Sequence, residues 1–429
     1  MPTPSLLIVP ARFKTGKLYS QIPTSGAGDF TITRNTEARR FNSAGLIESV
    51  ASGIPRLDYF TSGGTAGCPA LLVEPAGTNG ILNSADTRTN WTLGANLTSG
   101  AIDVIGVSGN NLTVAVSGSN IGAVLGRLQR PANNVALASG STYTISFFLK
   151  QTGTHTIGGY YALITGAAAG DLGAGFDVSG SFSSGSIYNS AGTTNRIRRV
   201  ERWGTDVFRC SETFTMTASG TLTSLNFAPL VSATSTINPA VGTQIGFAAP
   251  QIELGFVPTS FIPTTTGTGS RSADVVSVSG AVSGSIGQTE GTIYAEVGYS
   301  DNSSIRHLIA LSDGSSSNRI RLRIIAPTTL QMERSLAGSN ATMAITIPSS
   351  GIVKIAIGYS SAANGFIAYV NGSQAGIIAA ATATFTNELT RINLGSNSDN
   401  AGQLNDRIRA AALYTTRLTN AELATLTTP

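Results

Sequence analysis

The sequence predicts an all-β protein: a small N-terminal strand-and-turn segment, two β-sandwich domains and one short C-terminal helix. Three observations support this prediction. Charged residues make up only 12% of the 429 residues, about half of the usual share. Glycine is abundant, at 49 residues, and together with Asn, Asp and Ser it supplies turns between short strands. Several short segments alternate apolar and polar side chains, which is the period of a strand.

Residues 1–82 form the first block, in which glycine recurs too often for long elements. Leu6–Val9 is an expected short strand, and Asp29–Asn79 is a series of short strand and turn motifs. Because so small and loop-rich a unit has little interior, we expect it to bury its apolar residues against a neighbouring domain or a partner chain.

Residues 83–262 form the second block, where short strands with turns between them predict a sandwich. Tyr143–Leu149 and Phe208–Met216 are clear strands, and Gln244–Leu254 closes the block. The side chains expected on one face of the first two strands are Tyr143, Ile145, Phe147, Leu149, Phe208, Cys210, Phe214 and Met216.

Residues 263–274 are an expected linker, and residues 275–429 are an expected second sandwich. The stretch from 258 to 270 is rich in Pro, Thr and Gly, so we expect it to run extended over the surface between two domains. In Arg319–Ile324 three arginines alternate with apolar residues, and we expect the arginines to share one face. Asn371-Gly372 predicts a hairpin turn. In Leu418–Leu426, Thr419 and Glu422 form a capping box, which predicts a helix.

Charge and hydropathy argue against several function classes. A net charge of +4 over 429 residues gives only a weak electrostatic field. Nucleic-acid-binding proteins instead concentrate their basic residues in patches, so we expect no nucleic-acid partner. The stretch Arg196–Arg202 holds the one dense basic cluster, which we interpret as a solvated or subunit-facing strand edge able to pair with carboxylates across an interface. No apolar stretch approaches the length of a membrane span, and no basic region of a secretory signal opens the chain.

No catalytic or metal-binding constellation is predicted, and no cofactor is expected. Cys68 and Cys210 are interpreted as buried thiols and not as a disulfide. Acidic residues are sparse, and no pair suits glycoside hydrolysis. Isolated histidines lack a second zinc ligand, and Asx turns explain the Asp-Asn pairs better than calcium binding does. The residues weighed as metal ligands are His155, His307, Asp301-Asn302 and Asp399-Asn400.

Aromatic side chains are the candidates for sugar contact. We interpret Trp91 and Trp203 as core or edge packing. Tyr160 and Tyr161 are the carbohydrate-binding candidates, and because adjacent residues of a strand face opposite ways, only one of them can lie on a given face.

Residues 1–82 contain a specific order of short motifs. The residues that carry it are Phe30, Arg34, Phe41, Gly45, Leu46, Pro55, Arg56, Leu57, Asp58, Tyr59, Leu71, Leu72, Glu74, Pro75 and Asn79. This order resembles the virion-proximal segment of head and tail fibre or spike proteins of tailed bacteriophages.

Both sandwich blocks also resemble known families. In the second block the residues are Asn83, Ser84, Trp91, Tyr143–Leu149, Trp203, Phe208, Arg209, Cys210 and Gln251–Gly255. They resemble a carbohydrate-binding-module-like jelly roll. In the third block they are Gly291–Ile293, Tyr369–Gly372, Ile392–Gly395, Ala412–Tyr414 and Leu418–Leu423. They resemble a concanavalin A-like (laminin G-like) sandwich.

The resemblance implies a virion structural protein that docks to the particle by its N-terminal segment and presents its sandwiches for host-surface adhesion, with a glycan as the expected receptor, or for capsid decoration. It also implies other virion proteins as partners, a homotrimer, and synthesis in the host cytoplasm followed by function in the virion. The alternative is a surface-polysaccharide depolymerase with these sandwiches as accessory binding domains. A secreted bacterial lectin is disfavoured by the expected lack of a signal.

Overall fold

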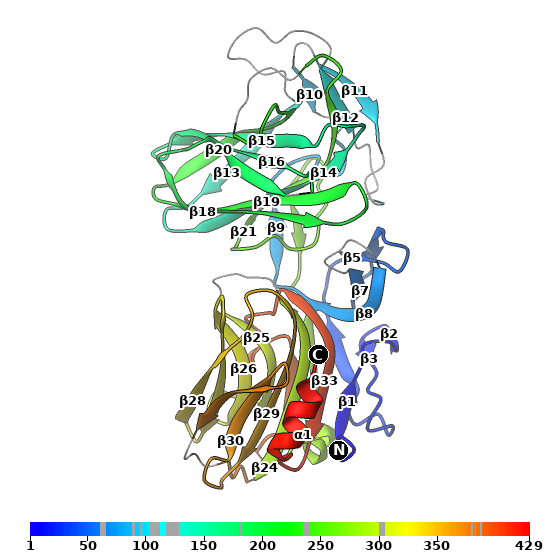
Figure 1. Ribbon diagram of the computed structural model, residues 1–429, viewed down its shortest axis with the longest axis vertical. Coiled ribbons are helices and arrows are strands. Elements are labelled where there is room, and N and C mark those ends of the chain that lie inside the picture. The colour runs from blue at the N-terminus through cyan, green and yellow to red at the C-terminus, as the bar shows by residue number, and fades with distance from the viewer. Residues whose placement is uncertain are drawn as a thin grey trace.

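The computed structural model describes residues 1–60, 66–87, 91–94, 97–102, 106, 112–116, 128–180, 182–234, 240–299, 305–378, 381, 383–386 and 388–429. These residues are mostly strand, with one short 3-10 helix, η1 (Ala281–Ser285), and one α-helix, α1 (Asn420–Thr427). The all-β prediction is confirmed. Figure 1 shows two sandwiches stacked along the long axis and joined by a narrow connection. Within the described ranges no helix is long and apolar enough to cross a membrane.

The first sandwich consists of two six-stranded antiparallel sheets. One sheet runs, in spatial order, β10 (Thr92–Leu93), β13 (Leu128–Leu137), β20 (Gly220–Pro229), β15 (Ile157–Gly166), β16 (Gly170–Asp177) and β17 (Ser183–Tyr188). The other runs β11 (Leu97–Ala101), β12 (Leu112–Val116), β21 (Gln244–Leu254), β14 (Thr142–Gln151), β19 (Val207–Met216) and β18 (Thr193–Arg202). All eight side chains predicted to share faces of β14 and β19 lie in the core between the sheets, as expected.

The second sandwich consists of an eight-stranded and a nine-stranded sheet. The first contains β31 (Ser373–Ile378), β30 (Phe366–Val370), β29 (Gly351–Ser360), β24 (Glu290–Tyr299), β33 (Asp406–Tyr414), β8 (Ala66–Val73) and β7 (Leu57–Phe60), with β1 (Leu6–Ile8) also on β33. The second contains β2 (Phe13–Lys14), β3 (Lys17–Leu18), β4 (Phe30–Thr33), β23 (Val275–Ser279), β32 (Arg391–Leu394), β25 (Arg306–Ser312), β26 (Arg319–Ala326), β27 (Thr329–Leu336) and β28 (Ser339–Thr346).

The N-terminal block belongs to this second sandwich. β1 and β8 hydrogen-bond to successive parts of β33, and β4 lies between β3 and β23. Its apolar side chains, among them Leu6, Leu18 and Phe30, are fully buried in the core of the second sandwich. The block therefore does bury its apolar residues against a domain, but the domain is the one farthest away in sequence.

The connection between the sandwiches differs from the surface-running linker that we predicted. β9 (Gly77–Asn79) leads into the first sandwich, β22 (Gly269–Arg271) leads back, and the two pair as an antiparallel ribbon. Thr264, Arg271 and Asp274 are at most 3% exposed. The predicted surface course is confirmed for residues 265–268, which are exposed, and wrong for Thr264 and Arg271, whose side chains have hydrogen-bond partners inside the protein.

Local predictions in the second sandwich are confirmed. Asn371 and Gly372 both adopt positive φ, at 47° and 85°, in the turn between β30 and β31, as a two-residue hairpin of this type requires. Thr419 and Glu422 form the predicted capping box of α1. Cys210 is a buried thiol, but Cys68 is exposed, so its interpretation as a buried thiol is wrong.

A hairpin of β5 (Ala38–Phe41) and β6 (Ile47–Val50) lies beside the connection. The ring of Phe41 meets that of Trp203 from the first sandwich edge to face, with centroids 5.8 Å apart. This contact brings an N-terminal element against the first sandwich, so the two sandwiches touch through more than the ribbon.

Candidate functional site

The two tyrosines proposed for sugar contact lie on opposite faces of β15. Tyr160 is 1% exposed and its hydroxyl donates to the carboxylate of Glu212 in the core. A ring enclosed in this way cannot stack on a sugar, so Tyr160 is a structural residue. Tyr161 is half-buried on the outer face, with its ring 5.1 Å from that of Tyr188. Trp91 and Trp203 are 6% and 7% exposed, which confirms their interpretation as packing residues.

Two arginines of the basic cluster on β18, Arg196 and Arg198, bind partners within the same chain. Glu212 is completely buried, and its carboxylate accepts from Arg196 Nε at 2.7 Å and pairs with Arg198 Nη2 at 2.8 Å. Arg196 also donates to the carbonyl of Gly173 on β16 at 2.9 Å. These arginines close the edge between the two sheets of the first sandwich, so for these two the interpretation as a solvated or subunit-facing edge is wrong.

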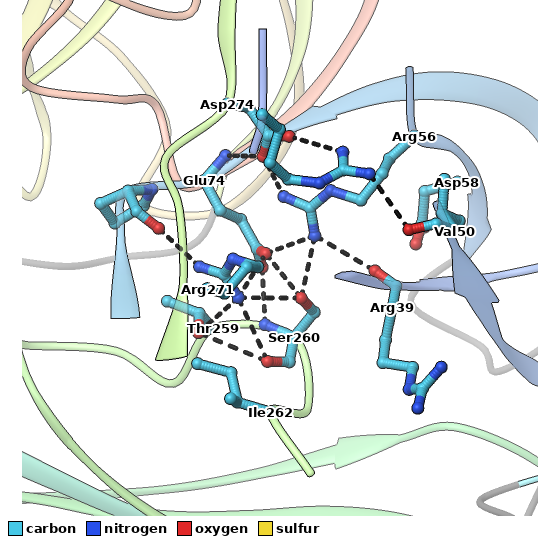
Figure 2. Close-up of polar contacts among 12 residues, drawn as sticks. Arg39, Val50, Arg56, Asp58, Glu74, Thr259, Ser260, Ile262, Arg271 and Asp274 are labelled. Atoms are coloured by element: carbon cyan, nitrogen blue, oxygen red, sulfur yellow. Dashed lines mark hydrogen bonds and ion pairs between the residues drawn. The ribbon is translucent and has the colours of Figure 1, made fainter. Parts of the chain in front are cut away.

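Five charged residues meet where strands of the second sandwich end, and we call them the junction cluster: Arg34, Arg56, Glu74, Arg271 and Asp274. Arg34 directly follows β4, and Arg56 directly precedes β7. Arg56 pairs with Glu74 at 2.6 Å and also with Asp274, and Arg271 reaches Glu74 at 3.1 Å (Figure 2). Arg34 Nη1 donates to Asp274 at 3.0 Å. All five are at most 4% exposed, so each charge depends on the others for compensation.

The junction cluster continues into the first sandwich through the segment after β21. Ser260 donates its N–H and its hydroxyl to Glu74, both at 2.7 Å. The preceding Thr259 donates its N–H to Glu253 of β21 at 2.9 Å. Burial would raise the pKa of Glu74, but the charges of Arg271 and Arg56 outweigh burial and hold that pKa well below its usual range. A carboxylate that stays ionised in this way suits a structural contact and not proton transfer.

Several residues that carry the resemblance to phage fibres are therefore buried inside this chain. Arg34, Arg56, Asp58, Glu74 and Asn79 are at most 4% exposed. Asn79 Nδ2, for example, donates to the carbonyls of Ile262 and Pro250, at 2.9 Å and 3.2 Å. A side chain enclosed in its own chain cannot contact another molecule, so these residues explain the fold of the junction and not a docking contact.

The outer face of the nine-stranded sheet carries the second charged group, and we call its arginines the arginine face: Arg319, Arg321, Arg323 and Arg391. The first three alternate along β26, as predicted, and each reaches the single carboxylate of Glu333, at 2.8, 2.8 and 3.0 Å. Arg391 instead donates to the amide oxygens of Asn393 and Asn400, at 2.9 Å and 2.7 Å. Three guanidinium groups thus share one carboxylate, and the fourth is held by two amide oxygens.

Strand register places these arginines in a mostly polar row on the side of the sheet that faces away from the core, although Asn393, Ala310, Arg321 and Glu333 in the middle of this row are at most 6% exposed. Neighbouring residues across six strands of the sheet are, in order, Ser277, Asn393, Ala310, Arg321, Glu333 and Thr342. Most residues that alternate with them along the strands, such as Ile320, Leu322 and Met332, are in the core, so this row faces away from the core. Arg323 is the most open of the three β26 arginines, with 21% of its side chain exposed. Guanidinium forks beside amides suit oxyanions and hydroxyl groups.

A loop between β32 and β33 supports the arginine face. Asp399 Oδ1 accepts from the N–H of Ala401 at 3.0 Å, which is the Asx turn that we expected. The neighbouring Asn400 uses its side-chain oxygen on Arg391, so neither supports a calcium site. Asp301 and Asn302 lie outside the described residues. Within the described residues no group of three His, Cys, Asp or Glu side chains could hold a metal ion.

Comparisons with known proteins give partial matches to solved structures only. No protein-family model and no curated protein matches the chain. The IT-sialidase CBM40 of Ruminococcus gnavus is 17% identical over 33% of this chain and 85% of its own, with a TM-score of 0.30. The SAP-like pentraxin of Limulus polyphemus is 13% identical over 32% and 70%, with a TM-score of 0.25. Mouse laminin alpha1 chain domains LG4-5 are 11% identical over 67% and 84%, with a TM-score of 0.24.

Proposed function

We propose that this chain is a non-catalytic virion protein of a tailed bacteriophage that binds an acidic glycan of the host surface. The observation that carries the glycan part is the arginine face, where three guanidinium groups share the carboxylate of Glu333 and a fourth, that of Arg391, donates to the amide oxygens of Asn393 and Asn400. The virion part rests on the order of motifs in residues 1–82.

An acidic polysaccharide suits this face because it repeats carboxylates and hydroxyl groups along its length. Arg323 and Arg391 are the arginines with the most freedom to reach it, since neither is fully buried. Contacts to half-exposed arginines are individually weak and are screened by salt. The trimer implied by the resemblance would supply avidity by presenting three such faces together.

The same geometry favours binding over hydrolysis. Glycoside hydrolysis needs two carboxyl groups across one cleft, one of them protonated. Burial would raise the pKa of Glu333, but hydrogen bonds from Arg321 and Arg319 outweigh it and lower that pKa. Glu333 therefore stays ionised and cannot act as the proton donor, which argues against the depolymerase alternative at this face.

Biolayer interferometry against purified host surface polysaccharide tests the glycan part. Replacing Arg323 and Arg391 together with Gln should weaken binding at least ~10-fold, since each lost charge contact is worth about 1 kcal/mol. The matched control is Arg409→Gln, which removes an arginine paired with Glu296 at 3.1 Å on the other sheet. Equal binding by the double variant, or sustained release of reducing sugar by the wild type, would contradict the proposal.

Labelling purified particles with antibodies against the first sandwich tests the virion part separately. We expect label at one fixed place on each particle. The contact with the particle would use exposed residues of the N-terminal block, such as Phe13 and Leu46, which are 38% and 41% exposed. Particles without label, together with intact glycan binding, would remove the virion part alone.

A further inference from the structure

We propose that the cavity between the two sandwiches is a binding site for an oxyanion: a carboxylate, phosphate or sulfate group. The cavity has a volume of about 70 Å³ and is lined from both sides. The first sandwich contributes Arg199, Trp203 and Arg209, and the other side contributes Arg39, Phe41 and Arg407. This site is separate from the arginine face and does not depend on the proposed function.

Arg209 is the residue that points to an anion. It is 6% exposed, and no carboxylate of the described residues lies within ion-pair distance of it. Its Nη2 donates to the carbonyl of Thr259 and, at 3.3 Å, to Ser146 Oγ, but its buried Nε has no partner. Burying a charge without a counter-charge is expensive. The rings of Trp203 and Phe148, 5.6 and 5.7 Å from the guanidinium carbon, offset only part of this cost.

Three of the four carboxylates that line the cavity pair with other arginines. Asp58 and Asp406 pair with Arg407, at 2.6 Å and 3.6 Å. Glu74 belongs to the junction cluster. Glu201 accepts from Trp203 Nε1 at 3.3 Å. Arg209 is thus a buried cation that faces the cavity without a carboxylate in contact. Burial lowers its pKa, and the more distant charges of Glu201, Glu253 and Glu74 offset this only in part.

The size of the cavity also suits a small anion. Its volume of about 70 Å³ is several times the roughly 10–15 Å³ that one water molecule needs. An oxyanion there could accept from Arg209 on the first sandwich and from Arg39 on the hairpin that packs against it. Because such a ligand would bind only when both parts are in place, it would stabilise the junction in proportion to the logarithm of its concentration.

Thermal unfolding of the full-length protein in different salts tests this site. Sodium phosphate, sulfate and glucuronate are compared with sodium chloride at equal ionic strength. We expect the unfolding midpoint to rise by a few degrees with at least one of the oxyanions, and Arg209→Met to lose this shift. The control Arg334→Met should keep it, because Arg334 is also buried without a carboxylate ion pair but does not line the cavity. A rise of the unfolding midpoint with glucuronate alone would identify the ligand as a sugar acid. A rise with phosphate or sulfate would identify it as a free inorganic anion.

A second measurement covers the case in which Arg209→Met does not fold. Crystals of the wild type soaked in selenate should show anomalous density for selenium beside Arg209. The proposal is overturned if no oxyanion shifts the wild type more than chloride does. It is also overturned if Arg209→Met keeps the full shift, or if selenate and glucuronate both leave the cavity empty of density.

Discussion

Arg56 is the residue on which the junction cluster depends most, because it pairs with both carboxylates of the cluster. We expect Arg56→Met to lower the free energy of unfolding by about 3–5 kcal/mol, since Glu74 and Asp274 would each lose a partner while buried. Urea unfolding measures this change. The control Arg409→Met removes a partly exposed ion pair and should cost less than about 1 kcal/mol. Equal effects of the two substitutions would show that Glu74 and Asp274 do not depend on Arg56 for charge compensation.

His307 makes stability depend on pH. Burial lowers its pKa to about 4, and the nearby charge of Arg321 acts in the same direction. Its Nδ1 lies 3.0 Å from the carbonyl of Gly402, and Arg321 Nη1 lies 3.4 Å from its Nε2, an arrangement that suits the neutral ring. Because the folded pKa is below the unfolded value of about 6.5, the unfolded chain binds more protons between these values. Stability is therefore fully present above about pH 6.5 and falls as pH drops towards 4.

The size of this effect is measurable by urea unfolding at about pH 7 and about pH 4.5. At 1.36 kcal/mol for each unit of pKa, His307 accounts for up to about 3 kcal/mol of the loss. We expect His307→Asn to lose less stability than the wild type over the same interval. All other titratable groups are the same in both proteins, so the difference isolates His307. Parallel curves would contradict the assignment.

At the scale of single elements, β1 shows how strongly the second sandwich depends on the N-terminus. Leu6 and Ile8 are fully buried, and the strand pairs with Leu413–Ala411 of β33. Deleting residues 1–9 should therefore cost several kcal/mol, from two lost core side chains at about 2–5 kcal/mol each when truncated and an unpaired strand edge. Hydrogen exchange should report lost protection along β33. A deletion variant as stable as the full chain would mean that β1 is dispensable.

At the scale of the whole molecule, the N-terminal and C-terminal parts of the chain form one sandwich together. The other sandwich is formed by the sequence between these two parts. The first sandwich has its own two sheets and core, so residues 80–262 expressed alone should give a cooperative unfolding transition. Residues 275–429 alone would lack β1, β4, β7 and β8 and the core side chains that they supply, and we expect this fragment to be unfolded until residues 1–79 are added. Circular dichroism and calorimetry of both fragments check this. A folded 275–429 fragment would instead favour an N-terminal block that acts as a separate docking segment.

The sequence by itself determined the local features of this protein, because strand periodicity, the Asn371-Gly372 turn and the Thr419–Glu422 cap act over a few residues. It also put the three β26 arginines on one face. Only the tertiary structure decided which strands pair, since residues 1–82 and 275–429 meet through contacts hundreds of residues apart that leave no local signal. The same distant pairing decides which partner a buried charge has. Tyr160 therefore donates to Glu212 in the core, and Arg34 and Arg56 of the N-terminal block lie in the junction cluster.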